Sequence, residues 1–432
     1  MNKNNPDAAK SDVGNNFENN FIFVLASVLK QAKDVRMYEK IGKSLIKKYK
    51  NATFHFVGQA SNNDTENIQK LENIHFHELF NFNRIALKRF YTFFTFLFFL
   101  LKIKPNILVI GTFELLLPSA FYKIFSFIFL RKKVKIIYDV QENYVANISY
   151  TKVFLPVLRE MIAIYVYLVQ KVTSFFVDFF FLAEYCYEQE LSFIGKNKKK
   201  YVILPNFILR EDFTGKLENN IIENQKTTGK TTHLLFLGTI SQEYGLQKML
   251  TYFEYITKKQ QEKQPKNIIK LTILGHCPLE TDFLAIKKLS KTNHLIDAQI
   301  NQKPIPYAQI KEKMKAATQT NILENTFVVM PYIINKSYEK RIPTKFYECL
   351  AYDLPMIIQK NTYWEDFFKQ MQKLIPAHKI NVFFIDFDDK ETPFDYKILS
   401  KKDNQNTQNS HLIADLPIFW DICEEKLNNI DF

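Results

Sequence analysis

The residues best suited to chemistry lie between positions 327 and 358, where an apolar run ends at Pro331 and a loop follows. That loop carries four charged side chains, Lys336, Glu339, Lys340 and Arg341. A helix is predicted to begin near Pro343, because proline is tolerated in the first turn of a helix. The free N–H groups and the positive dipole character of that helix end favour a bound phosphate.

Lys345 and Glu348 are three residues apart on the predicted helix and therefore share one of its faces. A cation and a carboxylate at this place could hold a diphosphate and a ribose diol, respectively. The spacing alone favours an ordinary surface ion pair, which contributes little to stability.

The same segment resembles the donor-site signature of retaining GT-B glycosyltransferases of the group-1 (family 4) type, K-x-x-E-x-x-A-x-x-x-P. The matching positions are Lys345, Glu348, Ala351 and Pro355. In that family the glutamate binds the ribose of a nucleotide-sugar donor, and basic residues bind its diphosphate. The resemblance implies that Lys345 and Arg341 are catalytic, and that no metal ion or other cofactor is required.

Further segments resemble landmarks of the same family, so the resemblance extends over most of residues 21–430. Residues 233–250 and 271–280 are similar to the first two strands of its donor domain, with their glycine turns. Residues 21–45 and 135–144 are similar to two strands of its acceptor domain and the loops that follow them. The donor-binding residues that the resemblance implies are Glu348, Gly238, Thr239, Gly275, Glu339 and Lys340. The acceptor-side candidates are Arg36, Gln141, Glu142 and Asn143.

Several positions depart from the family pattern. Lys340 stands where the family has a second glutamate, eight residues before Glu348, and Glu339 is one residue out of register. The loop at 241–244 carries no cation, so the basic residues of the later loop would have to bind the diphosphate. Gln141 stands in place of the family's acceptor-domain histidine and cannot act as an acid or a base.

Possible metal ligands form no complete set in the sequence. His75 and His77 alternate on a predicted strand and lack a third ligand, which indicates a structural role. Three acidic residues resemble the D-x-D metal motif of the other large glycosyltransferase fold, namely Asp386, Asp388 and Asp389. They follow a predicted strand and are typical of a solvated turn.

The secondary-structure elements that position the candidate site residues can be predicted from the sequence. Short apolar runs alternate with longer periodic segments from residue 21 to about 390. Such an alternation is typical of parallel sheets with helices on both faces. The predicted strands are 21–28, 52–58, 73–79, 107–112, 135–140, 176–183, 201–205, 233–239, 270–275, 294–300, 327–332, 355–359 and 382–387. The predicted helices between them are 36–49, 84–102, 115–130, 156–172, 184–194, 246–260, 280–291, 307–317, 344–352 and 363–374.

The predicted fold class is therefore α/β with two Rossmann-like domains, and the family resemblance implies a GT-B fold whose parallel sheets face each other across a ligand-binding cleft. We expect a disordered tail (1–19), an acceptor-side domain (20–205), a polar linker (206–232) and a nucleotide-sugar-binding domain (233–410). In the resembled family a terminal helix crosses back to the first domain, and we expect residues 411–432, which include Trp420, to do so.

The composition limits the class of protein. A chain of 432 residues exceeds the size at which one core stops growing, and 47% hydrophobic residues with only 10 Gly exclude fibrous and disordered classes. The 4 Cys are far apart and form no C-x-x-C pair, which excludes a disulfide framework and suits a reducing cytoplasm. No apolar run is long enough to span a bilayer as a helix.

The net charge of +13 is unevenly distributed along the chain. Between Arg84 and Lys135 ten basic residues stand against one acidic residue, Glu114, among many Phe, Leu and Ile. This pattern favours a face held against an anionic membrane surface. A solvated basic edge over buried aromatic residues explains it equally well. No recognisable nucleic-acid motif accompanies the charge, so we expect no nucleic-acid partner.

We expect a retaining glycosyltransferase that is cytoplasmic and peripherally bound to the inner face of the cell membrane. Its partners would be a nucleotide sugar and a glycan or lipid-linked acceptor in cell-surface polysaccharide or glycolipid assembly. Two other functions stay open: a sugar-nucleotide epimerase on the same fold, and a non-catalytic protein that binds a nucleotide sugar or a partner enzyme. The absence of a cation at 241–244 and the glutamine at 141 favour the non-catalytic alternative.

Overall fold

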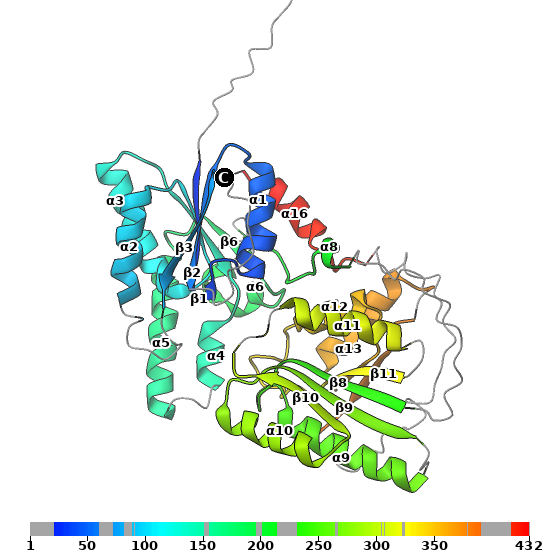
Figure 1. The fold of residues 1–432 in the computed structure, drawn as a ribbon. Coiled ribbons are helices and arrows are strands. Elements are labelled where there is room, and N and C mark those ends of the chain that lie inside the picture. Colours follow the sequence, from blue (N-terminus) through cyan, green and yellow to red (C-terminus); the bar gives the residue numbers. More distant parts are fainter. Residues whose placement is uncertain are drawn as a thin grey trace, which may run out of the picture. The chain divides into compact units, whose positions relative to one another are not determined.

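Two parallel β-sheets covered by helices make up the described part of the chain (Figure 1). The computed structural model describes residues 21–59, 72–81, 89, 91–150, 155–195, 201–213, 231–263, 267–303, 305, 307–321, 325–377, 379–389 and 416–431. The predicted tail at 1–19 and most of the predicted linker lie outside the described residues.

The first sheet has seven strands in the order β3-β2-β1-β4-β5-β6-β7. Its strands are β1 (Ile22–Gln31), β2 (Thr53–Gln59), β3 (Ile74–Phe80), β4 (Ile107–Ile110), β5 (Lys135–Val140), β6 (Phe179–Leu182) and β7 (Tyr201–Ile203). The helical segments among them are η1 (Val35–Gly42), α1 (Lys43–Lys48), α2 (Thr92–Ile103), η3 (Phe113–Leu115), α3 (Leu116–Phe129), α4 (Tyr144–Tyr150), α5 (Pro156–Thr173), α6 (Tyr187–Glu190) and α7 (Ser192–Gly195). Helices α2 and α3 lie on one face of this sheet and α1 on the other (Figure 1).

The second sheet has six strands in the order β10-β9-β8-β11-β12-β13. Its strands are β8 (Thr231–Thr239), β9 (Ile268–His276), β10 (Ile296–Asn301), β11 (Asn325–Met330), β12 (Met356–Gln359) and β13 (Val382–Ile385). Helices α9 (Leu246–Lys263) and α10 (Glu280–Thr292) cover one face, whereas α11 (Tyr307–Asn321), α12 (Thr344–Ala351) and α13 (Thr362–Leu374) cover the other (Figure 1). The remaining helices are α8 (Arg210–Phe213) and α16 (Asp421–Asn428).

Burial on both faces explains why the strands have nearly continuous apolar sequences. All four residues of β4, Ile107–Ile110, are buried, as are all four of β12. In the second sheet, Leu234 and Phe236 of β8 pack in one core with Met249 and Phe253 of α9. Each such side chain contributes about 1.5–3 kcal/mol relative to an exposed one. The strands predicted from the sequence are thus confirmed, whereas the short helices α4 and α8 were not predicted and the predicted helix 184–194 is divided into α6 and α7.

The first helical segment differs from the prediction of an α-helix over 36–49. It begins as the π-helix η1, and only its second part, α1, is α-helical. The side chain of Asp34 caps the π-helix, because its Oδ1 accepts hydrogen bonds from the backbone N–H groups of Arg36 and Met37 at 3.0 and 3.1 Å.

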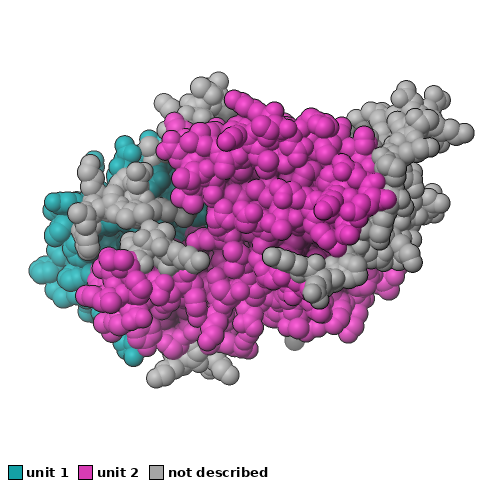
Figure 2. Space-filling view, turned by 90° about the horizontal axis from the view of Figure 1, so that it is seen from below, with its two compact units in different colours: residues 1–139, 169–180, 430–432 teal, residues 140–168, 181–429 magenta. Residues whose placement is uncertain are grey.

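The contacts divide the chain into two compact units, residues 1–139, 169–180 and 430–432, and residues 140–168 and 181–429 (Figure 2). Within the second unit, Lys426 of α16 donates a hydrogen bond to the carbonyl of Ile203 at the end of β7, at 3.2 Å. Phe419 forms a parallel bridge with Ile208, beside the buried Trp420. The terminal helix therefore packs beside the edge strand of the seven-stranded sheet, whereas the predicted domain boundaries and the crossover to the first domain stay predictions.

None of the described helices is both long enough and apolar enough to cross a membrane.

Three histidines lie together on β2 and β3 of the first unit. The rings of His55 and His75 stack at 4.7 Å, and Nδ1 of His55 lies 2.9 Å from Nε2 of His77. The alternation of His75 and His77 in the sequence did not indicate that His55 lies beside them. Burial, and to a lesser degree the neighbouring histidines, lower the pKa of His55 to about 4, so the ring is neutral near pH 7.

We predict that this cluster makes the first unit less stable in weak acid. The unfolded chain protonates His55 near pH 6.5, but the folded chain does so only near pH 4, so stability falls as the pH drops between these values. The loss should be about 2–3 kcal/mol, and burial also lowers the pKa of His77 in the same sense. Thermal unfolding at pH 7 and pH 5 measures it.

His55→Asn should flatten this pH dependence. His294→Asn, at an exposed position, is the matched control and should leave it unchanged. Equal pH dependence in the wild type and His55→Asn would contradict the assignment.

Candidate functional site

A cavity of about 330 Å³ in the second unit lies where β8 and β11 end. Its lining includes Gly238 and Thr239 from β8, Met330 from β11, and the start of α12. The remaining lining residues are Glu184, Phe236, Leu237, Tyr244, Val329, Tyr332, Tyr338, Arg341, Ile342, Pro343, Thr344 and Lys345. This is the carboxyl edge of a parallel sheet, where α/β proteins commonly bind ligands.

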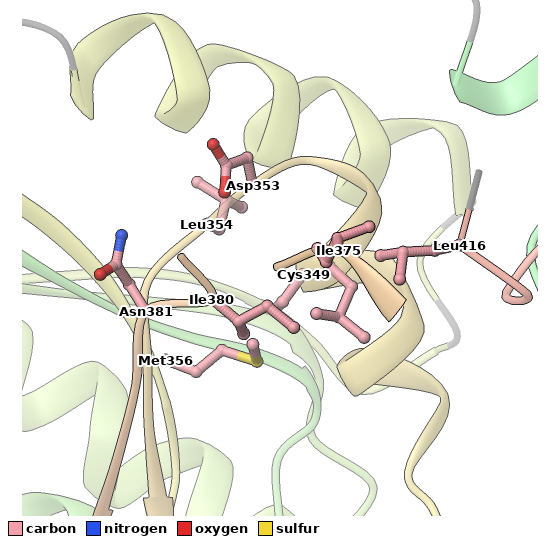
Figure 3. A pocket seen from close by; sticks show the side chains of 9 residues that line it. Cys349, Asp353, Leu354, Met356, Ile375, Ile380, Asn381 and Leu416 are labelled. Carbon is pink, nitrogen blue, oxygen red and sulfur yellow. The ribbon is translucent and has the colours of Figure 1, made fainter. Parts of the chain in front are cut away.

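A second cavity, of about 10 Å³, is too small for a ligand larger than a water molecule (Figure 3). It lies among mostly apolar side chains, including Cys349, Met356 and Leu416 (Figure 3). We therefore assign no function to it.

Glycines bring the backbones of β8 and β9 unusually close behind the larger cavity. A Cβ on Gly275 would lie 1.8 Å from the carbonyl oxygen of Gly238, its partner in the sheet. Gly238 itself has a φ of +110°, a backbone angle that residues other than glycine rarely adopt, and it faces Lys345. Gly238 lines the cavity, whereas Gly275 supports it from behind.

Arg341 reaches the cavity from the loop before α12. The buried Trp364 holds its backbone, because the indole Nε1 donates a hydrogen bond to the carbonyl of Arg341 at 2.7 Å. Its guanidinium lies over the rings of Tyr187 and Tyr338, with ring centroids 5.7 and 5.6 Å away. Burial lowers the pKa of Arg341, but Tyr187, Tyr338 and Glu184 raise it more, and the group stays charged.

The hydrogen-bonding capacity of this guanidinium is only partly used. Its Nε and Nη2 are buried and have no hydrogen-bond partner among the residues that the structure describes. A buried cation with unused donors is unfavourable unless an anion pairs with it. Arg341 lines the cavity, so an anion bound there would fulfil this need.

The start of α12 adds positive character beside Arg341. Pro343 precedes the helix, no side chain caps its first turn, and that turn contains no acidic residue. The N–H groups of the first turn are therefore available to an anion. Pro343, Thr344 and Lys345 all line the cavity.

Three tyrosines form an aromatic wall of the cavity that the sequence analysis did not identify. The hydroxyls of Tyr244 and Tyr338 lie 3.2 Å apart, and the ring of Tyr244 meets that of Tyr332 edge to face at 5.8 Å. Burial raises the pKa of Tyr332 and of Tyr338, so both hydroxyls stay protonated and can donate hydrogen bonds. Tyr332 and Tyr338 lie on the loop between β11 and α12, whereas Tyr244 lies on the loop after β8, so only the fold brings Tyr244 to the other two.

Lys345 and Glu348 are paired on α12, as their spacing suggested. The ammonium group of Lys345 binds Oε2 of Glu348, and their side chains are only 15% and 4% exposed. The pair is thus much more buried than an ordinary surface ion pair. Lys345 lines the cavity, whereas Glu348 lies behind it.

Glu339 and Lys340 are exposed and do not line the cavity. Their loop is held by Asn335, whose Oδ1 accepts hydrogen bonds from the backbone of Ser337 and Tyr338. Asn361 also donates a hydrogen bond to the carbonyl of Glu339 at 3.0 Å. The donor-binding role of these two residues stays a prediction.

A chain of hydrogen bonds within the second unit connects the residues after β5 with the Arg341 loop. Asn147 donates to Glu142 at 2.9 Å and accepts from Ser337 at 2.8 Å. Tyr187, which lies under Arg341, donates to the carbonyl of Gln141 at 3.3 Å. The acceptor-side candidates Gln141 and Glu142 therefore lie close to this loop, and Asn143 binds Glu190 at 3.0 Å.

Arg36 lies in the first unit and has a different environment. It is buried in a bidentate ion pair with Asp139 of β5, with N–O distances between 2.6 and 3.1 Å. This pair ties η1 to the sheet. The predicted role of Arg36 in acceptor binding is not tested by this contact.

No protein-family model and no curated protein sequence matches the chain. Solved structures do match: sucrose-phosphate synthase from Thermosynechococcus elongatus has a TM-score of 0.60 at 11% identity, over 94% of this chain and 97% of that one. The catalytic domain of starch synthase IV from Arabidopsis thaliana, bound to ADP and acarbose, has 0.55 at 12%, over 94% and 97%. Anabaena HepE in complex with UDP and glucose has 0.52 at 12%, over 95% and 99%.

These likenesses extend over almost the whole chain and establish the fold. The chain has the GT-B fold, with one seven-stranded and one six-stranded parallel sheet, and the predicted fold class is confirmed.

From the family resemblance, in which this glutamate binds the ribose, we predict that Glu348→Ala weakens binding of a nucleoside diphosphate by roughly 1.5–3 kcal/mol through the loss of charge-assisted hydrogen bonds. Lys345→Ala should reduce turnover more than binding, since charge on the diphosphate grows in the transition state. Titration calorimetry and steady-state kinetics separate the two effects. Asp366→Ala, at an exposed position on α13, is the control. Wild-type affinity and turnover in both Glu348→Ala and Lys345→Ala would show that the pair has only a structural role.

We further predict that Asp139→Asn destabilises the first unit by roughly 3–5 kcal/mol, because it leaves the buried Arg36 without its charged partner. The double variant Arg36→Met/Asp139→Leu should recover most of this loss, since it removes both charges. Denaturant unfolding of the three proteins provides the measurement. An unchanged unfolding midpoint in Asp139→Asn would show that the pair is not structural.

Proposed function

We propose that this protein transfers a sugar from a nucleotide-sugar donor to an acceptor, and that the donor diphosphate binds in the cavity of about 330 Å³. One observation carries the proposal: the half-buried Arg341 has two buried nitrogens with unused donors beside the uncapped start of α12. A diphosphate would accept hydrogen bonds from the unused donors of Arg341 and from the N–H groups at the start of α12. Similar structures hold ADP or UDP, which supports a nucleotide in the same fold.

The residues of the cavity would act on the leaving group. As the bond between the sugar and the diphosphate breaks, negative charge grows on the diphosphate oxygens. Arg341, Lys345 and the N–H groups of the first turn of α12 are already in place to stabilise that charge, so little reorganisation is needed. The tyrosine hydroxyls would orient the donor by hydrogen bonds.

The finer parts of the proposal rest on the resemblance seen in the sequence. They are retention of the anomeric configuration, a hexosyl donor, independence of metal ions, and an acceptor from cell-surface polysaccharide or glycolipid assembly on the cytoplasmic side of the membrane. Glu142 and Gln141 belong to the segment that would meet the acceptor, and the Asn147–Ser337 contact connects it with the donor loop.

A non-catalytic nucleotide-sugar-binding protein is the second candidate. It is favoured by one observation: Glu339 and Lys340, which occupy the region of the family's second glutamate, are exposed and do not line the cavity. Release of the nucleoside diphosphate from a donor, measured with and without candidate acceptors, separates a transferase from such a binder.

We predict that Arg341→Met weakens binding of UDP or ADP by about 10- to 100-fold, because the charged hydrogen bonds to the diphosphate are lost. The unliganded variant should unfold within a few degrees of the wild type, since the removed cation has unused buried donors. Nucleotide-dependent thermal shift and calorimetry measure both quantities.

The control is Lys369→Met, which removes a cation with a side chain 68% exposed on α13 and should leave affinity unchanged. Equal nucleotide affinity in Arg341→Met and the wild type, with folding intact, would rule out this diphosphate site.

A further inference from the structure

The outer side of α2 and α3 in the first unit is apolar. Phe94 and Phe98 of α2 are 57% and 67% exposed, and Phe127 and Phe129 of α3 are 68% and 69% exposed. The two helices are neighbours on the same face of the sheet (Figure 1), and the rings of Phe93 and Phe121 meet between them at 5.4 Å. We call these exposed residues of α2 and α3, together with Phe175, the aromatic face.

Phe175 joins this face through the loop after α5. It is 83% exposed, and the carbonyl of the next residue, Phe176, accepts a hydrogen bond from Lys123 of α3 at 2.9 Å. Lys123 also pairs with Asp178 at 2.6 Å, which fixes the loop against α3. The aromatic face therefore combines exposed side chains from two helices and from a loop held against α3.

The two helices do not need these outer side chains for packing. Phe96 and Leu100 of α2, and Tyr122 of α3, are fully buried and already anchor the helices on the sheet. The outer side of a helix at a protein surface is normally polar. Contiguous exposed apolar patches mark sites of interaction with another protein or a membrane.

Exposed cations lie in the last turn of α2 and beyond the carboxyl ends of both helices. They are Lys102, Lys104, Arg131, Lys133 and Lys135. Two acidic residues of the first unit, Glu114 and Asp178, are held in ion pairs with Arg89 and Lys123. The border of the aromatic face thus carries an excess of positive charge.

We infer that the aromatic face docks on the surface of a bilayer that contains anionic lipids. The exposed rings would enter the boundary between headgroups and acyl chains, and the cations would meet the lipid phosphates. α2 has 12 residues and a length of about 18 Å, too short to cross the hydrocarbon core, so it lies on the membrane. The alternative of buried aromatic residues under a basic edge does not hold, because these rings are exposed.

A second copy of the chain is the main rival occupant. A symmetric dimer through this face would bring two positively charged borders together, which is unfavourable at low salt. Anionic headgroups are complementary to the same border, and this charge complementarity favours the bilayer.

The first test is flotation of the full-length protein with vesicles of phosphatidylcholine alone or with about one third phosphatidylglycerol. We expect binding to the anionic vesicles, and a large loss at about 1 M salt, where the Debye length falls to about 3 Å. The variant Phe94→Ser/Phe98→Ser/Phe127→Ser/Phe129→Ser should lose binding at least ten-fold, and so should Arg131→Gln/Lys133→Gln/Lys135→Gln.

Matched control variants come from the helices of the second unit. Leu279→Ser/Leu284→Ser removes exposed apolar side chains near and on α10, and Lys288→Gln/Lys291→Gln removes exposed cations of the same helix. Both should bind vesicles like the wild type. Equal losses in the controls and in the aromatic-face variants would overturn the inference.

A tryptophan at position 98 gives a second, direct readout. The native Trp364 and Trp420 are buried, so the emission of a new exposed tryptophan can be resolved. In Phe98→Trp we expect a blue shift on anionic vesicles and quenching by brominated lipid, whereas Leu284→Trp should show neither. The inference is overturned if Phe98→Trp is unaffected, or if the protein ignores vesicles but forms a dimer that the four-serine variant abolishes.

Discussion

Parallel pairing of β8, β11 and β12 is the constraint on which the candidate site depends. Neighbouring parallel strands end at the same edge of a sheet, so the loops that follow them meet although the sequence separates them widely. The cavity, the Arg341 loop and the start of α12 all lie at that edge. The close contact of Gly238 and Gly275 pairs β8 with β9 at a point where a Cβ on Gly275 would collide with the carbonyl oxygen of Gly238.

At the same edge of the sheet, the fold holds the guanidinium of Arg341 in a fixed position before any ligand binds. Removing the guanidinium of Arg341 from water costs free energy, and the described residues leave two of its nitrogens without a hydrogen bond. The surrounding structure compensates by rigid support: Trp364 fixes the backbone, and two tyrosine rings face the charge. A site of this kind binds an anion without first having to arrange its own donors.

The strands could be predicted because sheets buried on both faces have apolar sequences that stand out from their loops. The Lys345–Glu348 pair could be predicted because helix geometry fixes side chains three residues apart on one face. The tyrosine wall could not be predicted, since Tyr244 and Tyr338 meet only through the tertiary fold. The partner of Arg36 escaped prediction for the same reason, as Asp139 lies 103 residues further along the chain.

The contact between α16 and the segment after β7 has a consequence for synthesis on the ribosome. Arg210 and Asp421 form an ion pair although they are 211 positions apart in the sequence, and the bridge between Ile208 and Phe419 spans a similar stretch. At 5–20 residues per second, translation of that stretch takes roughly 10–40 s, during which the six-stranded sheet can form. Throughout this time the segment around Ile208 lacks this partner, so the contact is among the last of the described contacts that can form.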